Sequence, residues 1–343
     1  MEIFMKRRQI VFTEKNVAKL LDVECAELAP NEVMVKTVVS TISCGTERAN
    51  ISGDANVSIN AEAKTAFPRT SGYNSAGIVV KKGAAVENIN IGDKVVVFWG
   101  KHTDYNIVCE ERVVKIEDDS LSFETGAMSF ISSFPMAAIR KTRLEMGESA
   151  IVMGLGILGM IAVKLLRTAG AVPIIAADPN PVRREIALKN GADYAFDPLH
   201  EGFAQEVKRV TDGGVNVAIE VTGVGAGFNE ALDCMAKFGR VALLGCTRNS
   251  DFTVDYYKKI HGPGITVIGA HTVARPKFES HPGWFTHRDD IKAVMKLCSG
   301  GRLKLENLIE ETHSPSECED VYRRLVFDKN FPIAVQFDWR KLK

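Results

Sequence analysis

The residues best suited to chemistry form a glycine-rich turn. The segment GLGILG, residues 154–159, fits the pattern G-x-G-x-x-G, and Asp178 stands at the end of the next predicted strand. In this pattern Gly154 permits a tight turn, Gly156 lets the backbone approach a pyrophosphate, and Gly159 lets helix and strand pack closely. The N–H groups at the helix start then bind phosphate. The motif therefore predicts a dinucleotide cofactor.

Asp178 and two later turns extend this predicted cofactor site. A carboxylate at the end of the second strand accepts both ribose hydroxyls and repels a 2′-phosphate, so NAD is favoured over NADP. The segments VTG and LLGC end later strands, and ligands bind at the carboxyl edge of such sheets. Arg183 either reaches the adenine ribose or is a solvated helix arginine. The predicted cofactor contacts are Gly154, Gly156, Ile157, Leu158, Gly159, Asp178, Arg183, Thr222, Gly245 and Ser133.

Strand and helix patterns alternate around the glycine-rich turn. SAIVMG is a short apolar strand, and ILGMIAVKLLRTAG has apolar residues at helical spacing and a stop at Gly170. The strand VPIIAAD and the helix PVRREIALKNG come next, with further helices expected around residues 201–211 and 225–236. Such alternation predicts a doubly wound α/β domain with a parallel sheet.

The chain before about Ser122 has a different pattern. NEVMVKTVVSTIS, AGIVVKKG and DKVVVFWG are β-branched runs separated by turn residues, and DYNIVCEERVVKI predicts a further hairpin-like pair. The pattern predicts a β-rich domain, a partly open barrel, with no helix before about Ser122. The C-terminal tail predicts two helices and a closing strand, IAVQFD, and it is expected to return to the first domain.

Composition excludes several classes of protein. Lys+Arg and Asp+Glu both number 43, so neither a nucleic acid nor a membrane surface is indicated as a partner. Seven cysteines without a CxxC pair favour a reducing compartment over a disulfide framework. The N-terminal segment has no apolar run suited to a signal peptide. The apolar stretch AIVMGLGILGMIAVKLL contains three glycines and a lysine and predicts a buried strand and helix. We therefore expect a cytoplasmic protein.

The order of the motifs CGTE, GDKV, GLGILG and RLKLENLI resembles that of the medium-chain dehydrogenase/reductase superfamily over nearly the whole chain. This resemblance implies a GroES-like catalytic domain, residues 1–130 and 270–343, and a Rossmann NAD-binding domain, residues 131–269. It also implies an active site in the cleft between the domains. Members usually pair their cofactor domains through the last sheet strand, here ITVIGA, so a homodimer or homotetramer is expected.

Zinc-dependent members of this superfamily bind the metal through a Cys, a His-Glu pair and a later Cys or Glu. Here Cys44 matches the first ligand, but the other positions hold Tyr73, Asn74 and Ser129. A thiolate, a phenol, an amide and a hydroxyl do not make a usual zinc site. The segments GTERANISGD, FPRTSGYNSAG and GKHTDY are most similar to the bacteriochlorophyllide-dehydrogenase-like branch, which lacks the metal histidine. The resemblance thus implies hydride chemistry without catalytic zinc.

Removal of a hydride from an alcohol requires a group that receives the O–H proton. The predicted catalytic residues are Tyr73, His102, Thr46 and Cys44. Tyr73 stands at the metal-histidine position, and Thr46 matches the Ser/Thr that passes the substrate proton in zinc members. Histidine is a common general base, which makes His102 a candidate, although the residue could also be a surface turn histidine. Cys44 is either part of this site or a buried small residue.

The segment between residues 271 and 287 adds further candidates. Its three histidines have spacings that match no common ligand pattern, so a rebuilt metal site that uses Cys44 and one of them remains an open alternative. Trp284 and Phe285 either close over a substrate or attach the tail to the cofactor domain.

The sequence therefore predicts an NAD-dependent oxidoreductase (EC 1.1.1.-) that interconverts a secondary alcohol, polyol or sugar and its carbonyl, with a small-molecule alcohol or carbonyl as its partner. Two alternatives stay open. A zinc-free quinone or enoyl reductase would pass hydride to a conjugated double bond, but such relatives favour NADPH and Asp178 opposes NADPH. A nucleotide-binding protein without turnover would keep the glycine-rich turn and lose the metal ligands.

Overall fold

The computed structural model describes residues 6–54 and 66–342. The chain folds into two compact units. Unit 1 consists of Met1–Ile131 and Ile291–Lys343, and unit 2 of Ser132–Asp290. Residues 270–290, assigned from sequence to the catalytic domain, thus group with unit 2. Arg275 explains this, because its guanidinium bonds the Ser133 carbonyl and the Asp290 carboxylate, both in unit 2. The start of the N-terminal segment, residues 1–5, lies outside the described residues.

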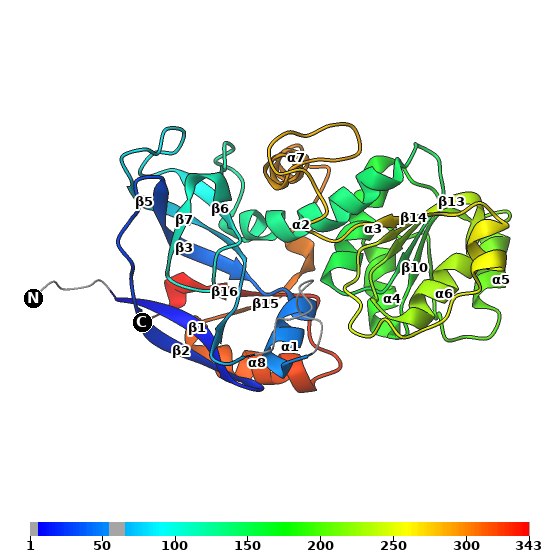
Figure 1. Ribbon diagram of the computed structural model, residues 1–343, viewed down its shortest axis with the longest axis horizontal. Coiled ribbons are helices and arrows are strands. Elements are labelled where there is room, and N and C mark those ends of the chain that lie inside the picture. The colour runs from blue at the N-terminus through cyan, green and yellow to red at the C-terminus, as the bar shows by residue number, and fades with distance from the viewer. Residues whose placement is uncertain (1–5, 55–65, 343) are drawn as a thin grey trace, which may run out of the picture. The chain divides into compact units, whose positions relative to one another are not determined.

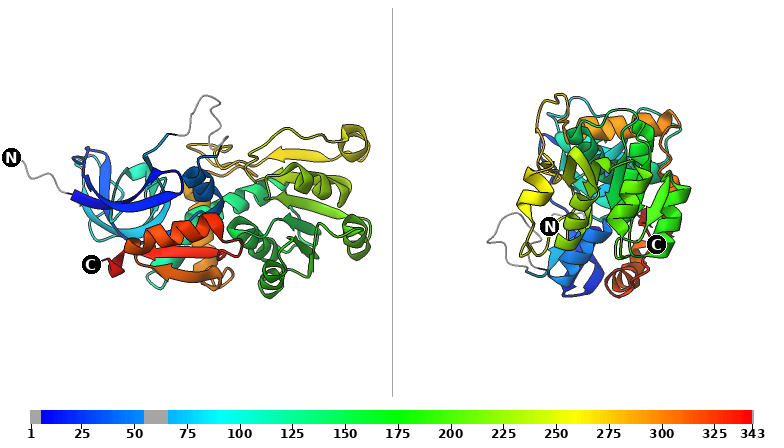
Figure 2. Two further views of the ribbon diagram at one scale, coloured as in Figure 1. Left: turned by 90° about the horizontal axis from the view of Figure 1, so that it is seen from below. Right: turned by 90° about the vertical axis from the view of Figure 1, so that its right-hand side faces the viewer.

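Unit 2 contains a six-stranded parallel sheet in the order β11-β10-β9-β12-β13-β14. The strands are β9 (Ala150–Met153), β10 (Ile174–Ala177), β11 (Tyr194–Phe196), β12 (Val215–Glu220), β13 (Met235–Leu243) and β14 (Thr266–Gly269). The connecting helices are α3 (Ile157–Ala169), α4 (Pro181–Lys189), α5 (Phe203–Val210) and α6 (Gly225–Asp233). The strand order reverses between β9 and β12, so the crossover helices lie on both faces of the sheet (Figure 2). This is the predicted doubly wound fold.

Local sequence explains these elements. β9 is buried at every residue, and α3 buries an apolar face against β9 and β10. α3 ends at Gly170, whose φ of 87° is a left-handed conformation that favours glycine. The apolar stretch that spans β9 and α3 is therefore a buried strand and helix, as predicted. Among the helices of the described residues, none is long and apolar enough to cross a membrane.

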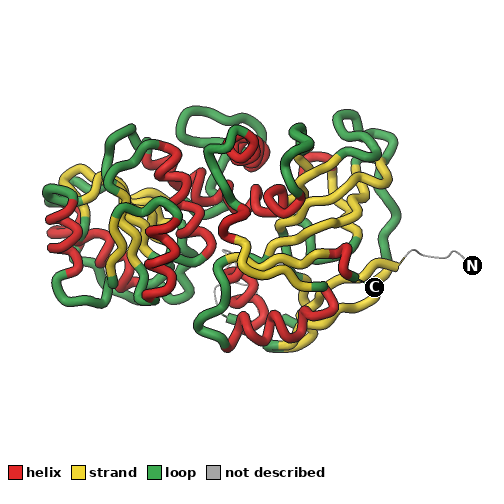
Figure 3. The backbone as a smooth tube through the Cα atoms, turned by 180° about the vertical axis from the view of Figure 1, so that it is seen from behind, coloured by secondary structure: helices red, strands yellow, loops and turns green. Residues whose placement is uncertain are grey.

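Unit 1 is mainly β-structure (Figure 3). One sheet has the order β15-β16-β3-β5-β6-β8 with β7 paired to β3, and a second has the order β2-β1-β4. Its strands are β1 (Lys6–Glu14), β2 (Val17–Glu24), β3 (Glu32–Thr41), β4 (Arg69–Thr70), β5 (Asn74–Lys82), β6 (Lys94–Phe98), β7 (Tyr105–Cys109), β8 (Val113–Lys115), β15 (Ile309–His313) and β16 (Ala334–Asp338). The tail returns to this unit as predicted, because β16 pairs with β3. Helices α1 (Cys44–Ser52) and α8 (Cys318–Phe327) lie side by side (Figure 1). Helices α2 (Phe123–Thr142) and α7 (His287–Ser299) each cross a unit boundary along the chain.

Two sequence predictions for unit 1 are wrong. The chain forms a helix, α1, well before Ser122. Its segment CGTERANIS has no amphipathic period and is short, so periodicity gives no signal. The strands β7 and β8 also do not form a hairpin: β7 pairs with β3, and β8 pairs with β6. Long-range pairing with strands that precede them determines their partners, and local pattern carries no information on it.

Candidate functional site

The glycine-rich turn of unit 2 connects β9 to α3 as expected. Gly154 has a φ of 93°, and a Cβ atom built on Gly159 would lie 1.9 Å from the Gly154 carbonyl oxygen, so neither position accepts a side chain. A Cβ atom on Gly156, in contrast, would meet no atom within 4 Å. Gly156 is the N-cap of α3 and makes no side-chain cap bond. The first N–H groups of α3, which include those of Ile157 and Leu158, therefore have no cap and suit a phosphate.

Asp178 follows β10 and holds this turn in place. Its carboxylate accepts the N–H of Leu155 at 2.8 Å through one oxygen and the N–H of Asn180 at 2.8 Å through the other. Each oxygen keeps a second lone pair for a ribose hydroxyl. The Arg183 guanidinium lies 3.9 Å from the same carboxylate, so these two predicted cofactor residues form an ion pair. The donor set at this edge fits a dinucleotide.

The remaining predicted cofactor residues of the sheet edge adjoin the same turn. A Cβ atom on Gly154 would lie 3.0 Å from the Thr222 Cγ2 atom, and one on Gly245 would lie 2.5 Å from the Gly223 nitrogen. Three loops, which follow β9, β12 and β13, therefore pack closely. Ser133 lies on α2 and is fully buried, and its hydroxyl has no hydrogen-bond partner among the described atoms. Such an orphaned hydroxyl is suited to a ligand group.

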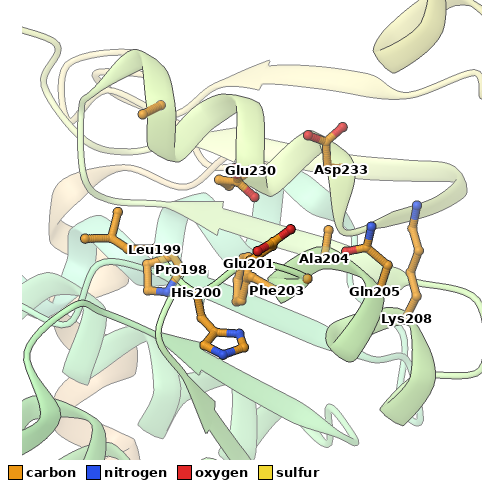
Figure 4. A pocket seen from close by; sticks show the side chains of 12 residues that line it. Pro198, Leu199, His200, Glu201, Phe203, Ala204, Gln205, Lys208, Glu230 and Asp233 are labelled. Atoms are coloured by element: carbon orange, nitrogen blue, oxygen red, sulfur yellow. The ribbon is translucent and has the colours of Figure 1, made fainter.

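A groove of about 620 Å³ opens beside this edge (Figure 4). The residues that follow β11 form one side, and α5 and α6 supply the others. Its wall includes the carboxylates of Glu230 and Asp233, and burial together with Asp233 raises the pKa of Glu230. Because β11 is the neighbour of β10, the groove adjoins the end of the sheet that carries Asp178.

In unit 1 the predicted proton-handling residues gather around the start of α1. The Tyr73 hydroxyl donates a hydrogen bond to the Ser43 hydroxyl, and Ser43 directly precedes the helix. The Tyr73 ring packs against Trp99 at 5.5 Å and Phe130 at 5.8 Å between centroids. Trp99 has a φ of 56°, which is rare for a bulky residue. The aromatic contacts around its ring and the hydrogen bond to Ser43 therefore hold Tyr73 in place.

His102 is fully buried, so it is not a surface turn residue. Its Nδ1 atom lies 2.7 Å from the Ser40 hydroxyl, and its Nε2 atom lies 3.1 Å from the Glu47 carboxylate. The indole of Trp339 donates to the Ser40 hydroxyl, which leaves that hydroxyl free to donate to Nδ1, and a proton on Nε2 would then be directed at Glu47. The ring is thus enclosed by protein, with Ser40 on one nitrogen and Glu47 on the other.

Glu47 connects His102 to the residues around Tyr73. Its carboxylate, only 2% exposed, also accepts the N–H of Ser43 at 2.8 Å and the hydroxyl of Tyr322 from α8. Burial raises the pKa of Tyr322 well above its usual value, so its phenol stays a donor. Gly72 permits this assembly, because its φ is 85° and a Cβ atom there would lie 2.6 Å from the His102 ring.

The other two predicted catalytic residues lie on α1. The Cys44 thiol faces the carbonyl oxygens of Ile42 at 3.9 Å and Ile333 at 3.8 Å, and the residue packs at the edge of an apolar cluster. Thr46 is half-buried, one turn along from Ser43. The structure thus brings Tyr73, His102 and the start of α1 together through Ser43 and Glu47. Sequence analysis missed these two connecting residues, although Glu47 is part of the CGTE motif.

The positions that match zinc ligands do not fit a zinc ion. Asn74 is 1% exposed and its amide group donates to the Thr41 carbonyl at 3.5 Å, and the Ser129 hydroxyl donates to the Thr125 carbonyl at 3.2 Å. Across residues 6–54 and 66–342 the structure contains no group of three or more His, Cys, Asp and Glu side chains that could hold a metal. Zinc requires about four such ligands in tetrahedral geometry.

The segment that follows β14 is attached to the second half of α2. The Arg140 guanidinium lies 3.8 Å from the centre of the Phe285 ring, and the Lys141 ammonium lies 4.5 Å from that of Trp284. Lys141 also donates to the carbonyls of Gly269 at 3.1 Å and Ala274 at 2.5 Å. Within unit 2 the two aromatic residues therefore hold the segment to the cofactor unit, which favours the second of the two predicted roles.

Comparisons with known proteins agree with this architecture. The alcohol dehydrogenase GroES-like domain matches residues 29–135, and the zinc-binding dehydrogenase domain matches residues 158–285. The L-threonine 3-dehydrogenase of Pyrococcus horikoshii is 27% identical over 320 residues, 85% of this chain and 87% of that protein. The (R,R)-butanediol dehydrogenase of Bacillus subtilis is 29% identical over 268 residues, 71% of this chain and 72% of that protein. The crystal structure of 2R,3R-butanediol dehydrogenase from Bacillus subtilis superposes with a TM-score of 0.81 at 23% identity and covers 97% of this chain and 99% of that one.

Proposed function

The chain belongs to the zinc-type alcohol dehydrogenase-like medium-chain dehydrogenase/reductase superfamily, and on that premise we propose that it interconverts a secondary alcohol, polyol or sugar and its carbonyl with NAD as cofactor and without catalytic zinc. An alcohol or polyol dehydrogenase-like oxidoreductase is what the named relatives support. The observation that carries the finer proposal is the contrast between the two units. Unit 2 has an intact dinucleotide turn, whereas in unit 1 three of the four metal positions hold Tyr73, Asn74 and Ser129.

In this proposal unit 2 binds the dinucleotide. The uncapped start of α3 would hold its pyrophosphate, Asp178 a ribose, and Ser133 the nicotinamide end. The bound nicotinamide supplies a hydride acceptor or donor. The negative charge of Asp178 is the argument for NAD over NADP, because a 2′-phosphate there would face a carboxylate that is only 7% exposed.

Unit 1 would supply the groups that accept or donate the proton when the hydride is transferred. Tyr73 is the group we assign to exchange a proton with the substrate hydroxyl, with Thr46 as the second hydroxyl of the site. Ser43 fixes the Tyr73 hydroxyl, and Glu47 fixes the Ser43 backbone. In place of the direct acid–base role predicted from sequence, we assign His102 a positioning role through Glu47.

The absence of catalytic zinc is part of the proposal, and an electrostatic argument supports it. A metal site of this superfamily has ionised ligands that balance the charge of the ion, whereas Tyr73, Asn74 and Ser129 are neutral groups. Loss of the metal alone would leave buried ligand charges without a counter-ion, at a cost of several kcal/mol. Neutral side chains at these positions avoid that cost, and side-chain hydroxyls can then accept or donate the substrate proton.

A homodimer or homotetramer also forms part of the proposal. β14 ends the six-stranded sheet, so its outer edge has no strand paired to it among the described residues. Val267 on this strand is 39% exposed. An open, partly apolar edge can pair with the same strand of a second copy. Size-exclusion chromatography with light scattering would detect the dimer or tetramer, and a monomer at micromolar concentration would contradict the proposal.

One set of measurements tests the catalytic proposal. The purified protein is assayed with NAD⁺ and NADP⁺ against a panel of secondary alcohols, polyols and glycosides, and its metal content is measured. We expect NAD⁺-dependent turnover of a panel member without stoichiometric zinc. Tyr73→Phe should lower kcat at least tenfold at unchanged NADH affinity, whereas Tyr105→Phe, a half-buried tyrosine of the same unit, should not. Stoichiometric zinc whose removal abolishes turnover would refute the metal-free mechanism. Cofactor binding without turnover of any panel member would instead favour a non-catalytic protein.

A further inference from the structure

Glu220 is a buried charged residue to which the proposed mechanism assigns no task. It is the last residue of β12 and is 2% exposed. None of the ion pairs between described residues includes it, and burial raises the pKa of its carboxyl group. A carboxylate buried without a cation is unfavourable unless several donors satisfy it. Its hydrogen bonds therefore indicate what it does.

All hydrogen bonds of the Glu220 side chain go to the turn that follows it. One carboxylate oxygen accepts the N–H of Thr222 at 2.7 Å, the hydroxyl of Thr222, and the N–H of Gly223 at 3.2 Å, and the other oxygen accepts the same Gly223 N–H at 3.3 Å. The main-chain carbonyl of Glu220 accepts the N–H groups of Leu244 and Gly245, each at 2.9 Å. A single residue thus connects the loop after β12 to the loop after β13.

The same two loops adjoin the glycine-rich turn. The Thr222 methyl group approaches Gly154, as described above, and a Cβ atom on Gly223 would lie 2.5 Å from the Cys246 carbonyl oxygen. Glycines occupy the closest approaches between the three loops. A shift of Thr222 by a few tenths of an ångström would therefore be transmitted to Gly154, where the pyrophosphate is expected.

We propose that Glu220 is a positioning residue for the dinucleotide: its carboxylate fixes Thr222 and Gly223 so that the loops after β9, β12 and β13 have their binding conformation before the cofactor arrives. This inference rests on the proposed cofactor function of unit 2. Preorganisation of this kind raises affinity because the loops need no ordering when the ligand binds. Glu220 itself touches no cofactor in this arrangement.

Glu220→Gln tests the proposal through NADH affinity, measured by fluorescence titration or calorimetry. In the amide an NH₂ group replaces one carboxylate oxygen, so it cannot accept the Gly223 N–H that this oxygen accepts, and the remaining oxygen carries no negative charge. We therefore expect about a tenfold or greater increase in the NADH Kd. Glu185→Gln makes the same chemical change at an exposed position of α4 and should leave the Kd unchanged. Thermal unfolding of both variants measures the purely structural effect.

A double-mutant cycle separates a positioning role from a general loss of stability. If Glu220 acts through Thr222, then Glu220→Gln combined with Thr222→Val should raise the NADH Kd by less than the product of the two single effects. A folded Glu220→Gln protein with wild-type NADH affinity would overturn the inference. If Glu220→Gln does not fold, Glu220→Asp takes its place, since the carboxylate remains but its side chain is shorter. An unchanged NADH Kd in Glu220→Asp would overturn the inference equally. Failure of the wild-type protein to bind NADH or NADPH would instead refute the proposed function.

Discussion

Lys141→Met tests whether a buried ammonium reduces the stability of unit 2 at neutral pH. Lys141 is 7% exposed and lies between two carbonyl oxygens and the Trp284 ring. Burial, together with the positive charge of Arg275, lowers its pKa from 10.5 to about 8, although Asp290 opposes the shift. In the unfolded chain the ordinary value of 10.5 applies. The charged form is thus less stable in the folded protein than in water.

The sign and size of the effect follow from this difference. Below pH 8 both the folded and the unfolded protein carry the charge, so the full cost of burying it is present. Between pH 8 and 10.5 the folded protein loses the proton first, and stability increases with pH. At about 1.4 kcal/mol per pKa unit, the shift corresponds to a gain of about 3 kcal/mol in total. About 2 kcal/mol of it should appear between pH 7.5 and 9.5.

Guanidinium unfolding followed by far-UV circular dichroism measures this gain at a series of pH values. Other titrating groups cancel when the wild type and Lys141→Met are compared at the same pH. We expect the difference in unfolding free energy to move in favour of the wild type by about 2 kcal/mol from pH 7.5 to 9.5. For Lys189→Met, at an exposed lysine of α4, the difference in unfolding free energy from the wild type should stay constant over this pH range. A constant difference between the wild type and Lys141→Met across this range would refute the argument.

Three further predictions concern the cofactor site and acid stability. Gly159→Ala should lower both the unfolding temperature and the NADH affinity, because its Cβ atom would lie 1.9 Å from a backbone oxygen. Gly156→Ala places its Cβ atom in open space, so it should weaken NADH binding without lowering the unfolding temperature. Equal effects of the two variants in both assays would contradict this prediction. Asp178→Asn should weaken NADH and strengthen NADPH binding in parallel titrations, and an unchanged ratio of the two Kd values would show that this carboxylate does not select the cofactor. Burial, with Arg275 nearby, lowers the pKa of His287 from 6.5 to about 3, so the unfolded chain protonates first and stability should fall as pH decreases from 6.5 towards 3. His287→Phe should flatten that fall in acid titrations of unfolding, and an unaltered slope would exclude His287 as its cause.

The turn to which we assign the cofactor was predictable because its signals are local in sequence. The spacing of Gly154, Gly156 and Gly159, the strand before them and the acidic residue after the next strand all lie between Ser149 and Asp178. Each requirement is also met by the residue itself: a positive φ, a missing Cβ or a carboxylate at a strand end. Helical and strand periodicities near this turn were equally local, and they predicted the elements of unit 2.

The arrangement in unit 1 was not predictable in the same way. Whether His102 is exposed or buried depends on Ser40, Glu47 and Trp339, of which two come from the start of the chain and the third from its C-terminal end. No periodicity marks a hydrogen bond between such distant residues. The short helix α1 was not predicted for a related reason. It is stabilised by packing against α8 rather than by an amphipathic pattern of its own.

Both units nevertheless use the same physical arrangement. Glu47 and Glu220 are each 2% exposed, and neither contacts a lysine or arginine among the described residues. Each accepts a backbone N–H from a turn that carries a proposed functional group, Ser43 in one unit and Thr222 in the other. A buried carboxylate without a cation costs several kcal/mol unless donors surround it. These turns therefore cannot move without leaving a buried charge unsatisfied, and that constraint is what would keep the Tyr73 hydroxyl and the dinucleotide turn in fixed positions.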